Sequence, residues 1–368
     1  MIHREAFLRD YELFWLRLPV DYAKLGDHPR ENGDLVALIF VILAMGTQFV
    51  PLPSADQKEQ SAEFHGSYII APNLAPTLLI CKVSASHQAL RVFSYLGKPS
   101  IRTIQTMVLI IYFLMNDNHA ADAFAFAGIL VRHAYALGLN RDPSRFCPNA
   151  SLCEKQTRRK LWQAIFFQDT FLTILLALPP TATHTDVRIE DLHPETDNSL
   201  TQANPTDVSY ISSMWHLAKI VQDTLCSPRA LDLPISKSQA ERTRLVDDFR
   251  RIYASFPEPL RTFSEIGICD LARRSKRLAR QALFLTSNYF HCLMLVYAEQ
   301  HANLRRDVNG TLNAAHDAIS SFFLLHTLFQ EEAKVWYHFS HRAFLEAVNL
   351  ISGPCSRRSI ILTRAFSK

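Results

Sequence analysis

The amino-acid sequence predicts an all-α fold, a multi-helix body around one continuous core. Apolar residues recur at helical spacing along most of the 368 residues. Glycine is scarce, with 10 in the whole chain, and β-branched stretches such as Tyr68-Ile69-Ile70 stand alone between helix and strand breakers. Hydrophobic residues make up 48% of the chain, which excludes disorder caused by low hydrophobicity.

The first helices follow from this periodicity and from residues that begin or end a helix. We expect helices over residues 5–16, 35–49, 82–96, 101–115, 119–138 and 154–178. Asp34 and Ser100 directly precede two of these segments and are expected to be N-caps. Gly138 follows an apolar segment and is expected to end its helix. Pro179-Pro180 should end the long segment that begins near Glu154.

The C-terminal part continues the helical pattern after a polar interruption. We expect helices over residues 208–226, 237–254, 267–302, 310–330 and 333–351. Residues 51–66 and 179–207 are polar with several prolines, so they are expected to be loops. Because the apolar pattern resumes directly after the second loop, we expect residues 1–351 to form one domain. Residues 352–368 break the pattern and are expected to form a loose C-terminal tail.

Charge, cysteine content and hydropathy exclude several classes of protein. The chain has 39 Lys+Arg against 35 Asp+Glu, a net charge of +4, too small for nucleic-acid binding by bulk electrostatics. Its seven cysteines form no Cys-x-x-Cys pair, which favours free thiols in a reducing compartment over disulfides or structural zinc. The uncharged stretch from Leu35 to Ala55 contains two prolines and leaves about sixteen helical residues, too few for a membrane span.

The sequence contains no motif typical of catalysis. It lacks a glycine-rich phosphate loop, a Gly-x-Ser-x-Gly elbow and a His-Glu-x-x-His motif. Glu190 and His193 form a lone Glu-x-x-His in a proline-rich loop and are not expected to bind a metal. His338 and His341 lie one helical turn apart, but their aromatic neighbours indicate a half-buried helix. We therefore expect no enzyme, no metal site and no cofactor in this sequence, although a triad assembled in space would leave no local motif.

Two further patterns have a structural and a functional interpretation. A run of basic residues lies within LARRSKRLARQ and comprises Arg273, Arg274, Lys276, Arg277 and Arg280. A solvated helix face is the favoured interpretation, and the alternatives are a nuclear import signal or a contact with phosphates. Aromatic residues also recur at helical spacing, at Phe113, Phe124, Phe126, Trp162, Phe166, Phe167 and Phe171. We favour the interpretation that these residues belong to an ordinary apolar core, and the alternative is that they line a cavity for an apolar effector.

Two blocks carry a more specific pattern. The first is SIRTIQTMVLIIYFLMNDNHAADAFAFAGILVRHAYALGLNRDPS, and the second is EKQTRRKLWQAIFFQDTFLTILLALPPTATHTDVRIEDLHPE. They resemble the middle homology region of fungal binuclear zinc-cluster transcription factors. The residues that carry the match are Gln105, Arg132, Gly138, Arg141, Asp142, Glu154, Arg158, Arg159, Trp162 and Asp169. Asn140 and Gln163 depart from the family pattern. The match is good over about residues 1–200, and the remainder agrees only in being helical.

The resemblance implies an all-α regulatory domain of a nuclear transcription factor that controls RNA polymerase II transcription. Physical chemistry gives the matching residues a mainly structural role. We expect Gly138 to end a helix and Arg141-Asp142 to cap or pair across a helix junction. Arg158, Arg159 and Asp169 are expected to form a charge network behind the tryptophan of the second block, which fixes geometry more than it adds stability.

The six-cysteine cluster that binds two zinc ions and reads DNA in this family does not occur in the sequence. Zinc and DNA are therefore partners of the full family architecture only, and we expect this chain to bind neither. The resemblance leaves open a homo- or heterodimer with related transcription factors and a small-molecule effector, and no membrane partner is expected. Two alternatives remain. One is a regulator without a DNA-binding module that acts by protein–protein interaction, and the other is a helical small-molecule-binding protein or enzyme.

Overall fold

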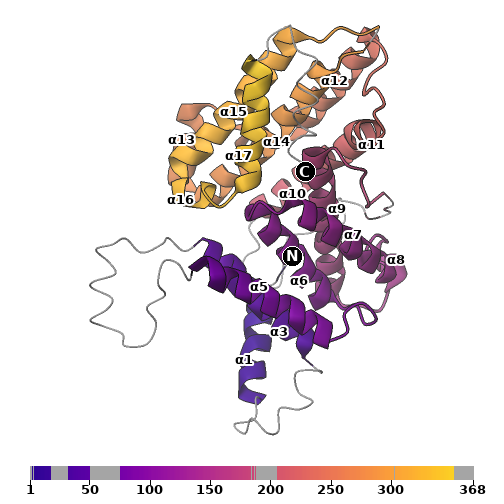
Figure 1. Ribbon diagram of the computed structural model, residues 1–368, viewed down its shortest axis with the longest axis vertical. Coiled ribbons are helices and arrows are strands. Elements are labelled where there is room, and N and C mark those ends of the chain that lie inside the picture. Colours follow the sequence, from indigo (N-terminus) through magenta and orange to yellow (C-terminus); the bar gives the residue numbers. More distant parts are fainter. Residues whose placement is uncertain are drawn as a thin grey trace, which may run out of the picture.

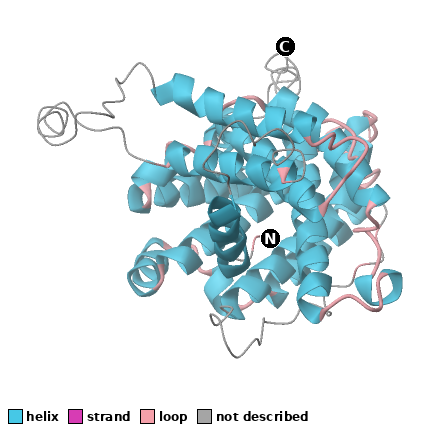
Figure 2. Ribbon diagram, turned by 90° about the horizontal axis from the view of Figure 1, so that it is seen from below, coloured by secondary structure: helices cyan, strands magenta, loops and turns pink. Residues whose placement is uncertain are grey.

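The protein is all-α, as the sequence predicts. The computed structural model describes residues 2, 4–17, 32–49, 75–183, 185, 187, 205–301 and 303–351. Within these ranges the regular secondary structure is helical and no strand is formed (Figures 1 and 2). An isolated β-bridge joins His301 and Leu304. The expected loop at residues 51–66 and the expected tail at residues 352–368 lie outside the described residues, as does most of residues 184–204.

The N-terminal helices form the lower half of the molecule in Figure 1. They are α1 (Arg4–Arg17), α3 (Gly33–Gln48), α5 (Ala75–Val92), α6 (Ile101–Asn116), α7 (Ala120–Ala136), the short α8 (Pro143–Phe146) and α9 (Leu152–Leu176). In α6, Ile104, Met107, Val108 and Ile111 are fully buried. Their spacing of three and four residues places them on one face, and this face packs in the first apolar core with side chains of α3, α7 and α9.

The C-terminal helices form the upper half. They are α10 (Pro205–Val221), α11 (Ser227–Ala230), α12 (Gln239–Ser255), α13 (Glu265–Arg274), α14 (Lys276–Ala298), α15 (Val308–Leu328), α16 (Gln330–Ala333) and α17 (Tyr337–Ile351), with a π-helical turn at Gln222–Cys226 and a 3₁₀ turn at Glu258–Arg261. Their buried apolar side chains form a second core around α14 and a third, smaller core where α13, α14 and α15 meet.

The described residues therefore hold three apolar cores where the sequence predicts one. Helices α9 and α10 link the first two, because Ile174 of α9 lies in the second core whereas Trp215 of α10 lies in the first. The Trp215 ring lies 4.8 Å from that of Phe166 of α9, between ring centroids. Phe167 and Phe171, also on α9, pack against both cores. These two helices thus form the structural connection between the two halves.

Local capping explains several helix ends. Ser100 is the N-cap of α6, as predicted, and forms a capping box with Thr103. The prediction for Asp34 is wrong, because α3 begins at Gly33 and Asn32 occupies the cap position. Asp34 lies in the first turn, where its Oδ2 accepts a hydrogen bond from Ser100 Oγ at 2.8 Å. Helix α9 ends at Leu176, just before the two prolines, with Ala177 at φ 54°.

Two expected helices are interrupted. The segment expected over residues 267–302 is broken at Ser275, whose Oγ accepts a hydrogen bond from the Leu278 N–H and caps α14. The segment expected over residues 333–351 contains α16 and α17 with a break between them. A third helix differs from its expected bounds of 82–96, because α5 begins at Ala75 and ends at Val92.

Candidate functional site

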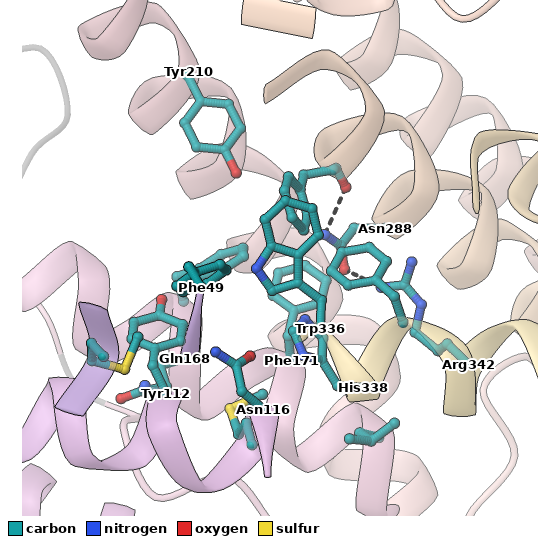
Figure 3. Close-up of a pocket in the computed structure, with 16 residues that line it drawn as sticks. Phe49, Tyr112, Asn116, Gln168, Phe171, Tyr210, Asn288, Trp336, His338 and Arg342 are labelled. Carbon is teal, nitrogen blue, oxygen red and sulfur yellow. Dashed lines mark hydrogen bonds between the residues drawn. The ribbon is translucent and has the colours of Figure 1, made fainter. Parts of the chain in front are cut away.

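A pocket lies where the two halves of the molecule meet (Figure 3). It has a volume of about 250 Å³. Its walls come from the C-terminal end of α3, from α6, α9, α10, α14 and α17, and from the segment before α17. The lining residues are Met45, Phe49, Tyr112, Met115, Asn116, Phe167, Gln168, Phe171, Leu175, Tyr210, Phe284, Asn288, Trp336, His338, Phe339 and Arg342.

Aromatic rings form most of the pocket wall. Trp336 lies between the halves, with its ring centroid 6.2 Å from that of Phe49 and 4.7 Å from that of Phe284. Phe284 also lies edge-on to Phe339, at 4.5 Å between centroids. Contacts of this kind add to the energy of simple apolar burial. The rings thus hold the N-terminal and C-terminal walls of the pocket against each other.

Two tyrosine hydroxyls face this pocket. Figure 3 shows the Tyr210 and Tyr112 side chains reaching towards the space beside Trp336 from opposite walls. Burial raises the pKa of Tyr112 to about 12, and burial together with the nearby Tyr112 raises the pKa of Tyr210. Both hydroxyls are therefore neutral at physiological pH and are available as hydrogen-bond donors and acceptors.

Polar atoms of the pocket wall also lack hydrogen-bond partners. Gln168 Nε2 donates to the Val108 carbonyl at 3.2 Å, but Gln168 Oε1 is buried and accepts no hydrogen bond. His338 Nδ1 is likewise buried without a partner. Burial, with a contribution from the Arg342 charge, lowers the pKa of His338 to about 3, so its imidazole is neutral. Unpaired buried polar groups are rare in proteins and are often sites for water or a ligand.

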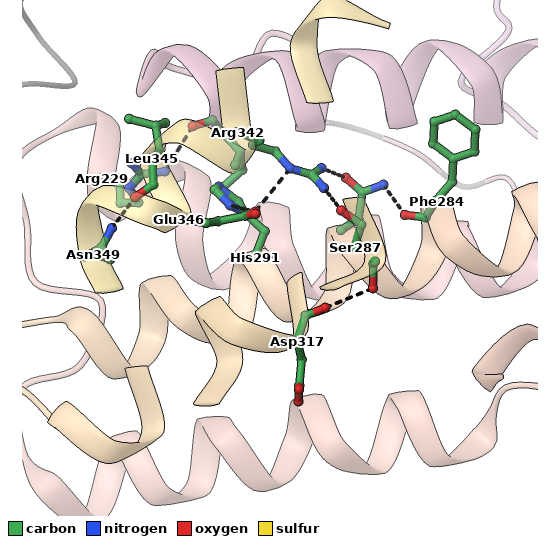
Figure 4. A network of polar contacts seen from close by, with 12 residues as sticks. Arg229, Phe284, Ser287, His291, Asp317, Arg342, Leu345, Glu346 and Asn349 are labelled. Atoms are coloured by element: carbon green, nitrogen blue, oxygen red, sulfur yellow. Dashed lines mark hydrogen bonds and ion pairs between the residues drawn. The ribbon is translucent and has the colours of Figure 1, made fainter. Parts of the chain in front are cut away.

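Behind the pocket, Arg342 belongs to a buried polar network (Figure 4). Its guanidinium donates to Asn288 Oδ1 at 2.5 Å and to the Ser287 hydroxyl, and its Nε lies 3.7 Å from Glu346 Oε1. The same Glu346 oxygen lies 2.8 Å from His291 Nδ1. Burial lowers the pKa of His291, and the Glu346 carboxylate opposes this. The one charged side chain among the described residues of the pocket wall is thus already paired with a carboxylate.

A second cluster of polar contacts lies at the junction of α7, α8 and α9. Gly138, at φ 65°, follows the end of α7. Asp142 caps α8 by accepting a hydrogen bond from the Ser144 N–H, and its Oδ1 also accepts one from Arg159 at 2.9 Å. Burial raises the pKa of Asp142, but the Ser144 N–H and Arg159 more than compensate, so the pKa is lowered. Arg158 connects α9 to α7 by donating to the Leu137 carbonyl at 3.2 Å.

The remaining signature residues lie at several separate places. Trp162 is fully buried, and its indole N–H donates to Thr185 Oγ1 at 2.9 Å. Asp169 does not join the two arginines in one cluster: its Oδ2 accepts hydrogen bonds from the backbone N–H groups of residues 181 and 182. Burial raises the pKa of Asp169, and these two N–H groups oppose that rise. Glu154 pairs with Arg158 at 3.1 Å. The other three are Gln105, buried in α6, and Arg132 and Arg141, both exposed.

The basic run lies at the junction of α13 and α14. Four of its members are exposed: Arg273, Arg274, Lys276 and Arg277. Arg273 pairs with Asp270 at 2.8 Å. Arg280 is only partly exposed, pairs with Glu332 at 3.2 Å and lies over the Phe329 ring. The run is therefore a solvated surface at a helix junction, and its last member holds α14 against the region of α16.

Within the described residues, nowhere do three or more His, Cys, Asp or Glu side chains gather as ligands for a metal ion. Every helix in those ranges also falls short of the length and apolarity that crossing a membrane requires. Among the thiols described, Cys226 and Cys292 are buried, and burial raises the pKa of both, which makes them poor nucleophiles.

Sequence reasoning named Phe167 and Phe171 as candidates for an apolar cavity, and both line the pocket. It missed Tyr112, Tyr210 and Trp336, because no local motif connects residues from α6, α10 and the segment before α17. The aromatic-rich start of α17 is the one sequence signal in this region, and by itself it predicts only a half-buried helix.

Comparison with known proteins identifies the class and then the family. Three relatives similar in sequence to this all-α chain are named as transcription factors. Residues 1–256 match the family described as the fungal specific transcription factor domain, and the chain belongs to this family. No solved structure matches the chain.

The relatives are similar to about half of the chain. The Zn(2)-C6 fungal-type transcription factor pigI of Monascus ruber is 24% identical over 182 residues, which cover 49% of this chain and 19% of the relative. The Zn(2)-C6 fungal-type transcription factor mpsB of Macrophomina phaseolina is 27% identical over 187 residues, covering 49% and 21%. Activator of stress genes protein 1 of Candida albicans is 24% identical over 185 residues, covering 48% and 16%. The chain thus spans about a fifth of the length of these relatives.

Proposed function

We propose that this chain is the regulatory domain of a nuclear transcription factor that controls RNA polymerase II transcription. The observation that carries the proposal is the family match over residues 1–256. In this proposal the chain is not an enzyme, and DNA is bound through a zinc-cluster module of the kind that the names of the relatives describe, rather than through these helices. Residues 1–351 act as one domain, since α9 and α10 contribute to the cores of both halves.

We further propose that the signature residues maintain the fold. Arg159 and Asp142 pair across a helix junction, and Asp169 holds the backbone that follows α9. These groups contact protein atoms rather than an open surface. The exposed part of the basic run, by contrast, is accessible to an import receptor, which is consistent with a nuclear protein.

We also propose that regulation acts through the pocket between the halves. Trp336 contacts Phe49 of the N-terminal half and Phe284 of the C-terminal half. A molecule that enters beside Trp336 therefore changes the contact between the halves. An effector-dependent change of this contact would alter the surface presented to the transcription machinery.

A reporter assay in yeast tests the regulatory role. The full 368-residue chain is fused to an unrelated DNA-binding module and tested on a weak and on a strong promoter. We expect expression to differ on at least one promoter from that with the module alone. A matched fusion with Trp162→Ala, which removes a large fully buried side chain, should lose the difference. The proposal would be contradicted if, on each promoter, the fusion gave the same expression as the module alone while the fusion was present in the nucleus.

A further inference from the structure

The side chains that line the pocket between the halves indicate which kind of ligand it can bind. Aromatic rings line it on both sides: Phe49 and Phe171 belong to the N-terminal half, and Phe284 and Trp336 belong to the C-terminal half (Figure 3). Flat faces and edges of this kind favour a flat aromatic guest, which can stack on one ring and meet another edge-on. The volume of about 250 Å³ is just below the range of drug-sized pockets. It suits a compound with one ring or two fused rings.

The charges of the pocket wall argue against an ionic guest. No carboxylate is among the described residues that line the pocket, so these residues offer a cation no counter-charge. Among the described lining residues, Arg342 alone carries a full charge. Its guanidinium donates to Asn288 and Ser287, and its Nε lies 3.7 Å from Glu346 Oε1. An anion would have to compete with Glu346 for this guanidinium. Because burying an uncompensated charge is costly, a neutral guest is favoured over either ion.

The polar groups of the pocket indicate that the guest carries oxygen. The hydroxyls of Tyr112 and Tyr210 approach the space from opposite walls, and neither is joined to a protein partner by a hydrogen bond within the described part of the chain. Gln168 is 2% exposed, and its Oε1 is also unpaired. A hydroxyl or carbonyl on the guest could satisfy these groups, whereas a pure hydrocarbon would leave them unpaired.

We propose that the pocket is a binding site for a neutral aromatic compound that carries a hydroxyl or carbonyl oxygen, held between Trp336 and the hydroxyls of Tyr112 and Tyr210. Its role as an effector rests on the regulatory function proposed above. The binding itself does not, because it is a property of the isolated chain.

The test uses four probes of one shape and measures their binding to the purified full chain by equilibrium dialysis. The probes are 2-naphthol (neutral with a hydroxyl), naphthalene (no hydrogen-bonding group), 2-naphthoate (anion) and 2-naphthylmethylammonium (cation). We expect 2-naphthol to bind once per chain and about 2- to 10-fold more tightly than naphthalene, the ratio for one net hydrogen bond. Both ions should bind at least about tenfold more weakly than 2-naphthol.

Substitutions locate the site. Tyr112→Phe together with Tyr210→Phe should reduce the affinity for 2-naphthol to that for naphthalene and leave naphthalene binding unchanged. Tyr337→Phe, at an exposed tyrosine outside the pocket, is the matched control and should change neither. Leu175→Trp fills the pocket and should abolish binding of both probes; if that variant does not fold, the tyrosine variants alone decide.

Three results would overturn the proposal: no binding of any probe, tightest binding of an ion, or 2-naphthol affinity unaffected by the two tyrosine substitutions. The result is independent of the reporter assay. Binding in vitro without a reporter effect would reject the regulatory function and retain the site. A reporter effect without binding would support the regulatory function and reject the site.

Discussion

Trp336 lies edge-on to Phe49, with their ring centroids 6.2 Å apart, and this contact joins the two halves of the molecule at the pocket (Figure 3). The two residues are far apart in sequence, and each sits in a short segment next to a helix end: Phe49 follows α3, and Trp336 precedes α17. On its other side Trp336 contacts Phe284 of α14. The indole therefore contacts both halves of the molecule at the pocket.

Trp336→Ala should destabilise the protein, because it removes the aromatic contacts to both Phe49 and Phe284. Truncation of a large buried aromatic costs about 3–5 kcal/mol, and since Trp336 is only partly buried we expect about 1–3 kcal/mol. Urea unfolding measures this loss. Trp15→Ala is the matched control, since the Trp15 side chain is exposed on α1, and it should change the free energy of unfolding by less than about 0.5 kcal/mol. Equal effects of the two substitutions would contradict the bridging role.

Gly138→Ala should destabilise the end of α7 for two reasons. Gly138 has φ 65°, a left-handed conformation that costs other residues about 1–2 kcal/mol. A Cβ there would also lie 2.6 Å from the Phe146 ring. Gly128→Ala, inside α7 and with open space where the new Cβ would lie, is the control and should raise stability by about 0.5–1 kcal/mol. Thermal unfolding of both variants checks the opposite signs, and a stabilising Gly138→Ala would refute the account.

The sequence was sufficient for features that depend on neighbouring residues. Ser100 could be predicted as an N-cap because a capping box is local, and the positions of most helices followed from apolar periodicity. The break at Ser275 was missed because it lies within a basic, helix-favouring run. At that position a serine can either continue the helix or cap a new one. Here Ser275 caps α14, and side chains of α13 and α14 pack together in the third core.

The pocket could not be predicted in the same way. Its polar groups come from α6, α9, α10, α14 and α17, so their proximity depends on how the two halves pack. The resemblance to a family drew attention to Arg158 and Arg159 but could not assign their partners. Only the three-dimensional arrangement shows that Arg159 reaches Asp142 across 17 positions of sequence, whereas Arg158 pairs with Glu154 of its own helix and also donates to the Leu137 carbonyl.

Arg159→Ala should destabilise the protein more than Arg158→Ala does. The Arg159 side chain is buried and donates to Ser144 Oγ and to the part-buried Asp142 carboxylate, so its removal loses a hydrogen bond to a charged group, at a cost of about 1–3 kcal/mol. The partner of Arg158, Glu154, is half exposed, and such pairs contribute less than about 1 kcal/mol. Urea unfolding of both variants gives the comparison. The reverse order would show that the Arg158 bond to the Leu137 carbonyl is the stronger link.

His338 should make the fold sensitive to acid. Its folded pKa is lowered to about 3, below the ordinary value near 6.5, so only the unfolded chain binds a proton between these values. Stability therefore falls as the pH drops below about 6.5, by up to about 2 kcal/mol at about pH 5. His338→Gln should remove this part of the decline, as measured by urea unfolding at about pH 7.5 and about pH 5. His316→Gln, on the exposed face of α15, is the control. An unchanged pH dependence in His338→Gln would contradict the prediction.

Glu346→Gln should be strongly destabilising, because Glu346 is the shared carboxylate of the buried network in Figure 4. Its Oε1 lies 2.8 Å from His291 Nδ1 and 3.7 Å from Arg342 Nε, and both partners are buried. Removing one member of a buried ion pair leaves an uncompensated charge, at a cost of about 3–5 kcal/mol. Glu331→Gln removes an equivalent carboxylate from an exposed pair with Lys334, where the cost should stay below about 1 kcal/mol. Urea unfolding at neutral pH compares the two. If Glu346→Gln cost no more than Glu331→Gln, Glu346 would not be the group that compensates the Arg342 charge.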